Sequence, residues 1–193
     1  DVTGDGLYDY IVGPSSPAIA TVLVINGANG VVQTSFNAFP AYRGGINVAA
    51  ADINGDGANE IIVGTMGGTV ATVAVFNSTG STRLTQFQPF GTNFRSAVRV
   101  SAIDTTGAGQ SDIVTAAGSG GVPVVRTYRY GNNRVTAVSS FYAFSTSYRG
   151  GVTVSAGVVW RVLGQICLPT QDHVIHEHRK TPSLGNDIFR LTI

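Results

Sequence analysis

An all-β fold built from repeated four-stranded units is predicted by three features of this 193-residue sequence. Acidic loops recur at nearly equal intervals, short runs of alternating polar and apolar residues lie between them, and Asn/Gly turns separate those runs. The composition agrees with this prediction, because 43% hydrophobic residues, 25 glycines and only 12% charged residues are typical of a folded, turn-rich chain with a sizeable core.

The repeat is the clearest pattern in the chain. The segments DVTGDGLYD, DINGDGANE and DTTGAGQSD begin at Asp1, Asp52 and Asp104, and therefore lie 51 and 52 residues apart. Aromatic residues, Tyr/Phe-Arg pairs and the segments GGINVAAAD, SAVRVSAID and GGVTVSAGV recur in step with them. Agreement at so many positions indicates one structural unit of about 52 residues that is used three times.

Each unit contains the pattern of four short strands. In the second unit, EIIVG follows the acidic loop, ATVAVFN leads to the turn NSTG, TRLTQFQPF alternates polar with apolar residues, and AVRVSAID leads to the next loop. Four antiparallel strands in a repeat of this length are typical of a β-propeller blade, whereas a β-sandwich needs no fixed period. We therefore predict a β-propeller of four-stranded blades over residues 1–157.

The distribution of acidic residues points to a bound cation. Of the 11 Asp and Glu residues, eight lie in the loops 1–9, 52–60 and 104–112, and the other three lie beyond residue 170. Acids that serve solubility are scattered over a surface and mixed with bases. Clustered carboxylates with other oxygen ligands suit a hard cation such as Ca²⁺.

Side chains at loop positions 1, 3, 5 and 9 can converge on one point, because the glycines allow a tight backbone turn. In the first loop, the predicted Ca²⁺ ligands are the side chains of Asp1, Thr3, Asp5 and Asp9 and the carbonyl of Leu7. In the second loop, they are the side chains of Asp52, Asn54, Asp56 and Glu60 and the carbonyl of Ala58.

The third loop departs from this pattern at its fifth position. Ala108 stands where a carboxylate is expected, while Asp104, Thr106 and Asp112 remain as candidate ligands. We predict either a weaker site, in which water replaces the lost ligand, or an empty one.

An EF-hand loop begins in a similar way, but its twelfth position excludes that interpretation. An EF-hand has a bidentate Glu at this position and helices on both sides. This chain has Val12 and Val63 there, both within strand-like runs.

The loops DVTGDGLYD and DINGDGANE, each followed by YIVG or IIVG, resemble the calcium-binding FG-GAP, or integrin-α-type, β-propeller repeats, which are VCBS-like. The resemblance covers about residues 1–157. It implies a calcium loop between the first and second strands of each blade, with Ca²⁺ acting mainly to hold the structure together. Related propellers occur in extracellular adhesion receptors, in fungal lectins and as accessory domains of secreted polysaccharide-degrading enzymes, and the resemblance does not choose among these.

Residues 158–193 form a different kind of sequence, which contains all three His residues and the only Cys, Trp and Lys. We interpret it as a divergent tail: a capping segment, a fusion or the product of a reading-frame change. His173, His176 and His178 match no zinc motif, so a solvated segment is the simpler interpretation. Cys167 has no partner for an internal disulfide and is most simply a small apolar residue.

The strand pattern does not complete a ring. The first unit lacks a strand before Asp1, and residues 150–156 form a first strand without a matching blade. Joining these pieces gives three blades, fewer than the usual four to eight. We favour a fragment of a longer array over a fourth blade supplied by the tail or several chains sharing one ring or fibre.

The predicted function is non-catalytic. No G-x-S-x-G elbow and no His before residue 158 is present, and the acids recur once per unit, as structural ions do. Without a basic run or a membrane-spanning apolar run, we expect neither a nucleic-acid partner nor a membrane span. We predict a calcium-stabilised module, extracellular or at the cell surface, for binding a protein or glycan, for adhesion or for assembly; a lectin and an accessory domain of a secreted polysaccharide-active enzyme are the alternatives.

Overall fold

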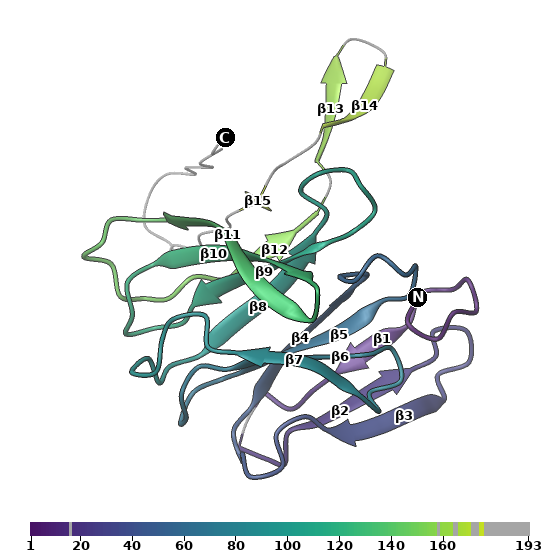
Figure 1. Cartoon of the computed structure of the whole chain (residues 1–193), viewed down its shortest axis with the longest axis horizontal. Coiled ribbons are helices and arrows are strands. Elements are labelled where there is room, and N and C mark those ends of the chain that lie inside the picture. The colour runs from purple at the N-terminus through teal and green to yellow at the C-terminus, as the bar shows by residue number, and fades with distance from the viewer. Residues whose placement is uncertain (16, 158, 164–165, 171–173, 176–193) are drawn as a thin grey trace, which may run out of the picture.

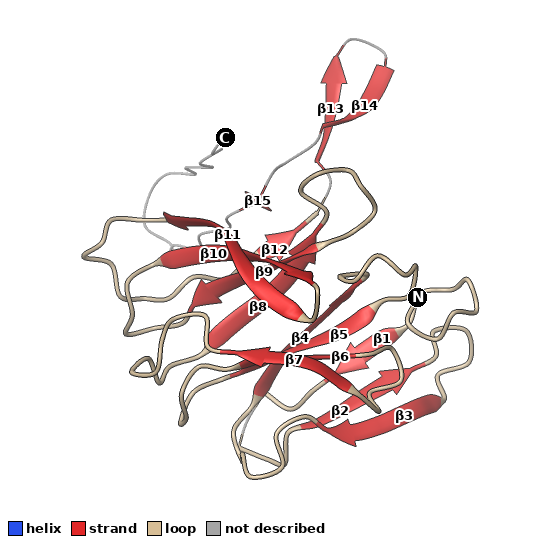
Figure 2. Ribbon diagram, in the orientation of Figure 1, coloured by secondary structure: helices blue, strands red, loops and turns tan. Residues whose placement is uncertain are grey.

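The computed structural model describes residues 1–15, 17–157, 159–163, 166–170 and 174–175. In these ranges every regular element is a β-strand and every strand pair is antiparallel, so the predicted all-β class is confirmed (Figure 2). The described residues contain no helix long and apolar enough to cross a membrane.

Three sheets follow one another along the chain, and consecutive strands pair within each of them (Figure 1). The first sheet has three strands: β1 (Tyr10–Val12), β2 (Thr21–Ile25) and β3 (Val32–Asn37). The second has four: β4 (Ile46–Ala51), β5 (Glu60–Thr65), β6 (Val73–Phe76) and β7 (Arg83–Phe87). The third also has four: β8 (Val98–Ile103), β9 (Asp112–Ala117), β10 (Val124–Gly131) and β11 (Arg134–Tyr142).

Burial of the strands follows their place in each sheet. The inner strands β5 and β9 are buried at every position, and both are rich in the β-branched residues that fit a sheet covered on both faces. The outer strands β7 and β11 are largely exposed or half-buried. The acidic segments 52–59 and 104–111 connect the first and second strands of their sheets, and the first acidic segment leads directly into β1.

Apolar faces of neighbouring sheets pack against each other and make the core. Val22 and Val24 of the first sheet share one cluster with Ile61 and Val63 of the second. A second cluster joins the second sheet to the third sheet. A third cluster joins the third sheet to the segment around Val152. This stacking of sheets in chain order explains the period of the sequence, since each unit buries its faces against its neighbours.

The aromatic residues that recur with the repeat take part in this packing. Phe39 and Tyr42 pack on the first cluster, and Phe90 and Phe94 on the second. The rings of each pair meet edge to face, at centroid distances of 6.1 and 5.2 Å. The hydroxyl of Tyr42 also donates a hydrogen bond of 2.8 Å to the carbonyl of Gly67, so it ties the first unit to the second.

The chain continues beyond the third sheet in four short strands. They are β12 (Ser155–Ala156), β13 (Val159–Leu163), β14 (Ile166–Thr170) and β15 (Val174–Ile175). β12 pairs with β15, and β13 forms a hairpin with β14 that projects from the rest of the chain in Figure 1. The strand expected at residues 150–156 is thus limited to two residues. Cys167 lies in β14, while His173, His176 and His178 lie outside the described residues. The division into residues 1–157 and a tail stays a prediction.

Candidate cation-binding loops

The three acidic loops share one backbone geometry, which their first aspartate holds. In the second loop, the carboxylate of Asp52 accepts hydrogen bonds from the backbone N–H groups of Gly55 at 2.6 Å and Gly57 at 2.8 Å. Both glycines have positive φ angles, 81° and 87°, which explains why glycine is required there. The same pair of bonds joins Asp1 to Gly4 and Gly6, and Asp104 to Gly107 and Gly109.

The second loop brings its predicted side-chain ligands together. The Asn54 amide donates to Asp56 Oδ2 at 2.9 Å and to Glu60 Oε1 at 3.1 Å. Glu60 Oε2 accepts the backbone N–H of Ile53 at 3.1 Å. Asn54, Asp56 and Glu60 therefore meet around one point, although they come from a turn and from the start of β5. Ala58, whose carbonyl is the remaining predicted ligand, lies in the exposed part of this turn.

The charges of the second loop are unbalanced within the described part of the chain. Glu60 is 2% exposed, and its burial raises its pKa, with a further rise from the negative charges of Asp56 and Asp52. The pKa of Asp56 is lowered, first by the N–H of Ala58 and then by the Asn54 side chain. No Lys or Arg of the described residues forms an ion pair with these three acids. A cation bound among them would remove their mutual repulsion.

The first loop is built in the same way, with one polar residue that the sequence analysis missed. Asp9 Oδ2 accepts the N–H groups of Val2 at 2.8 Å and Thr3 at 2.9 Å. Burial alone would raise the pKa of Asp9, but these bonds and one from Gly27 outweigh it and lower the pKa to about 2. The carboxylate of Asp5 accepts a hydrogen bond from the buried Asn26 amide.

Asn26 could have been found from its spacing. It follows Asp1 by 25 residues, as Asn77 follows Asp52 and Arg129 follows Asp104. The remaining predicted ligand of the first loop, the carbonyl of Leu7, belongs to a residue that is 52% exposed.

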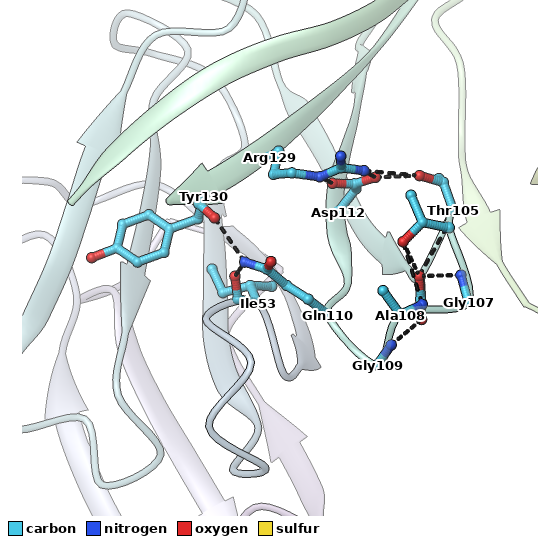
Figure 3. A network of polar contacts seen from close by, with 11 residues as sticks. Ile53, Thr105, Gly107, Ala108, Gly109, Gln110, Asp112, Arg129 and Tyr130 are labelled. Atoms are coloured by element: carbon cyan, nitrogen blue, oxygen red, sulfur yellow. Dashed lines mark hydrogen bonds and ion pairs between the residues drawn. The ribbon is translucent and has the colours of Figure 1, made fainter. Parts of the chain in front are cut away.

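The third loop differs from the other two in what its last acid contacts. Asp112 is fully buried and pairs with Arg129, whose Nε lies 2.8 Å from Oδ1 and whose Nη2 lies 2.7 Å from Oδ2 (Figure 3). The hydroxyl of Thr105 donates to the same carboxylate. Thr106, a predicted ligand, instead directs its hydroxyl to Asp104 at 3.0 Å. The carboxylate that the sequence analysis assigned to a cation therefore has a partner from within the chain.

Hydrogen bonds connect the three loops in a row. Asn59 donates to the carbonyl of Asp1 at 2.6 Å, and the N–H of Ser111 donates to the carbonyl of Asp52 at 2.7 Å. The Gln110 amide joins the carbonyls of Ile53 and Tyr130, each at 2.7 Å (Figure 3). Each loop is therefore hydrogen-bonded directly to the next one along the chain.

The donor atoms of the first two loops suit Ca²⁺. In the described part of the chain, no three His, Cys, Asp or Glu side chains form a metal centre by themselves. A calcium loop does not require one, because amide, hydroxyl and backbone oxygens complete its six to eight ligands. The first two loops offer oxygen donors of all these kinds and neither imidazole nor thiolate, which a zinc-like ion would prefer.

Comparison with protein families identifies the repeat. The family described as FG-GAP-like repeat matches residues 1–63, and the FG-GAP repeat matches residues 44–83. Residues 1–83 therefore match FG-GAP repeat models, as in an FG-GAP repeat protein. The matches contain the first two acidic loops, and the third, altered loop lies beyond them. None of the curated proteins matches the sequence.

Solved structures with a similar fold include three enzymes described as rhamnogalacturonan lyases. They are the exotype lyase YesX (17% identity, TM-score 0.53), the Bacillus licheniformis lyase PL11 (16%, 0.55) and the lyase YesW (15%, 0.53). The matches cover 73, 75 and 75% of this chain and 32, 33 and 33% of the lyases, respectively. The chain thus spans about a third of each enzyme, and at these identities the likeness is one of fold alone.

Proposed function

We propose that this FG-GAP repeat chain is a calcium-stabilised β-propeller module, extracellular or at the cell surface, that serves binding, adhesion or assembly and has no catalytic role. The observation that carries the proposal is the meeting of Asn54, Asp56 and Glu60 in a loop without a cationic partner among the described residues. The first loop shares the backbone hydrogen bonds of the second, since Asp1 and Asp9 accept N–H groups of their own loop as Asp52 and Glu60 do.

In this proposal Ca²⁺ acts through linkage. The ion binds the folded loops and has little affinity for the unfolded chain, so the free energy of unfolding rises with free Ca²⁺. The oxygen atoms that would hold it are those named above for the first and second loops. Loops of low affinity fit the millimolar Ca²⁺ outside cells, which supports the proposed location.

The propeller arrangement is supported by the sheets themselves. Each buries its faces against the next, as blades do, and two of them have four strands in simple up-and-down order. Among the described residues the first sheet has three strands, so a complete ring would need strands from the tail, from elsewhere in a longer protein or from other chains.

A ligand-binding role has a candidate location between the first and second units. A groove of about 800 Å³ there is lined by Tyr42, Arg43 and Met66, among others, and by Arg83 at the start of β7. Phe39 and Tyr42 also line this groove, but both are half-buried against the core, so they are less available for stacking on a sugar than fully exposed rings would be. This favours a protein or a charged glycan over the stacking mode of sugar binding.

A second candidate is an accessory domain of a polysaccharide-active enzyme. The observation that favours it is the shared fold with three rhamnogalacturonan lyases. Binding of pectic polysaccharide by the isolated chain, measured by affinity electrophoresis, would support this candidate. Unchanged mobility across pectins, together with calcium-dependent binding of a protein surface, would favour the adhesion role.

The proposal is tested by melting the protein in millimolar Ca²⁺ and in excess EGTA, with Mg²⁺ at equal concentration as the ion control. At Ca²⁺ about 100 times the dissociation constant, each site adds about 2.7 kcal/mol. Since the chain offers two such sites, Asp56→Ala should remove about half of the calcium-dependent rise in melting temperature. An equal melting temperature in Ca²⁺ and EGTA for the wild-type chain would refute the calcium role.

A further inference from the structure

We propose that Arg129 takes the place of the cation in the third acidic loop, so that its guanidinium rather than Ca²⁺ balances Asp112 and keeps residues 104–112 folded. The inference builds on the proposed calcium role of the other two loops. Its main test is made without calcium, so it can fail or succeed independently of that role.

The strand register gives Arg129 its place. In the third sheet Ile113 pairs with Tyr128, so one step earlier Asp112 stands opposite Arg129. The same step in the second sheet, from the pair Ile61 and Phe76, sets Asn77 opposite Glu60.

In the first sheet the pair Tyr10 and Ile25 likewise sets Asn26 opposite Asp9. In the first and second loops, the residue opposite the last acid is therefore an asparagine with a neutral side chain. It is an arginine only in the third loop, which has lost its central carboxylate.

The guanidinium of Arg129 binds the Asp112 carboxylate as a cation would. Arg129 meets both oxygens of Asp112 at 2.8 and 2.7 Å, a bidentate geometry that fits guanidinium and carboxylate well. The Asp112 side chain has no exposed surface, whereas that of Arg129 is 40% exposed. The buried carboxylate therefore depends on this arginine, while the arginine keeps contact with water.

At three positions the third unit differs from the other two in ways that make its loop less suited to a cation. Ala108 removes the carboxylate at position 5, and Arg129 adds a positive charge beside position 9. Thr105 replaces the buried apolar residue at position 2, which is Val2 or Ile53 in the other loops, and gives Asp112 a hydroxyl partner. A Ca²⁺ ion at Asp112 would have to displace Arg129 or lie next to its charge. The residues of this loop therefore do not fit the ion that the other two suit.

An ion-independent third loop would support its neighbour. The N–H of Ser111 and the side chain of Gln110 hold the carbonyls of Asp52 and Ile53, at the start of the second loop. In the absence of Ca²⁺ these bonds keep one end of the second loop in position for the ion.

The first test replaces Arg129 by the residue found at the equivalent positions. In excess EGTA, Arg129→Asn should lower the melting temperature by roughly 5 °C or more, because a buried carboxylate is left without its partner. The control is Arg134→Asn, which removes the same charge from an exposed site in the same sheet. Equal melting temperatures for the two variants would overturn the proposal.

If Arg129→Asn fails to fold, the double variant Arg129→Asn/Asp112→Asn should recover a cooperative transition, because the buried charge is then absent. A double variant that remains unfolded would also overturn the proposal, since the loss would then not come from an unpaired Asp112.

The second test counts bound ions by equilibrium dialysis with ⁴⁵Ca²⁺. Relative to the wild type, Ala108→Asp/Arg129→Asn should bind one additional Ca²⁺ per chain, since it restores the acid at position 5 and the neutral amide. A loss of bound Ca²⁺ in the wild-type background on Asp104→Asn would show that the third loop already holds an ion, and would overturn the inference. Absence of Ca²⁺ binding at every loop would refute the proposed function but leave the result in EGTA valid.

Discussion

At the scale of single residues, the proposed calcium role predicts that Glu60 determines how the second loop responds to the ion. Its carboxyl is buried and its pKa is raised, first by burial and then by Asp56 and Asp52, so without a cation the ionised form destabilises the folded loop at neutral pH. Glu60→Gln should therefore raise the melting temperature in EGTA by roughly 2–4 °C and remove the calcium response of this loop. Asp56→Ala removes an exposed acid and should give no such rise in EGTA.

The sign of this effect can be checked against pH. Because the folded-state pKa of Glu60 is raised, the stability that its neutral form contributes is present below the ordinary Glu pKa and is lost as pH rises through the folded-state value. In buffer freed of Ca²⁺ beforehand, the wild type and Glu60→Gln should have similar melting temperatures near pH 4 and should diverge toward pH 7. A difference that stays constant with pH would mean that the substitution acts by shape and not by charge.

The candidate ligands could be read from the sequence because ligands within one loop are close in sequence. The spacing of Asn54, Asp56 and Glu60 was sufficient to predict that these three side chains meet, whereas their role as calcium ligands stays a prediction. Arg129 and Asn26 lie in another strand, and their contact with an acid depends on strand register. The 25-residue spacing from the first Asp of each loop does mark Asn26 and Arg129. It indicates their contact with an acid only once the pairing of the strands is known.

At the scale of elements, the acidic loops should respond to acid because backbone N–H groups hold their carboxylates. Burial alone would raise the pKa of Asp104, but bonds from Thr106, Gly109 and Gly107 lower it to about 2. Ionised Asp104 therefore contributes stability above its ordinary pKa, near 4, and this contribution is lost as pH falls toward 2. In buffer freed of Ca²⁺ beforehand, Asp104→Asn should flatten the dependence of the urea midpoint on pH between about 4 and about 2. A slope equal to that of the wild type would contradict this account of the loop.

Strands were predictable where alternation and turns coincide, as in β5 to β8. The same reasoning gave too long a strand at residues 150–156, where only β12 forms. Alternation indicates that a segment can be extended, but pairing needs a neighbour along its edge. In that segment Val152 and Val154 are buried against the third sheet. Their alternation reflects packing against a face and not only strand pairing.

At the scale of the whole molecule, the first sheet lacks the strand that β4 and β8 supply to the other two. Among the described residues β1 pairs only with β2, and it carries exposed apolar side chains, with Tyr10 65% and Val12 44% exposed. Its counterparts β5 and β9 are paired on both edges and buried throughout. An uncovered edge of this kind favours pairing with another strand.

A strand placed before Asp1 should therefore complete the first sheet. We expect fusion of a second copy of residues 44–51, which lead directly into the second acidic loop, to raise the melting temperature in Ca²⁺ by roughly 5 °C, because it pairs the open edge of β1 and covers Tyr10 and Val12. It should also reduce self-association, measured as mass in solution. A Gly/Ser extension of equal length is the control. If both extensions leave the melting temperature and the mass unchanged, the edge of β1 does not pair with an added strand. Assembly into a ring would then have to proceed through other surfaces.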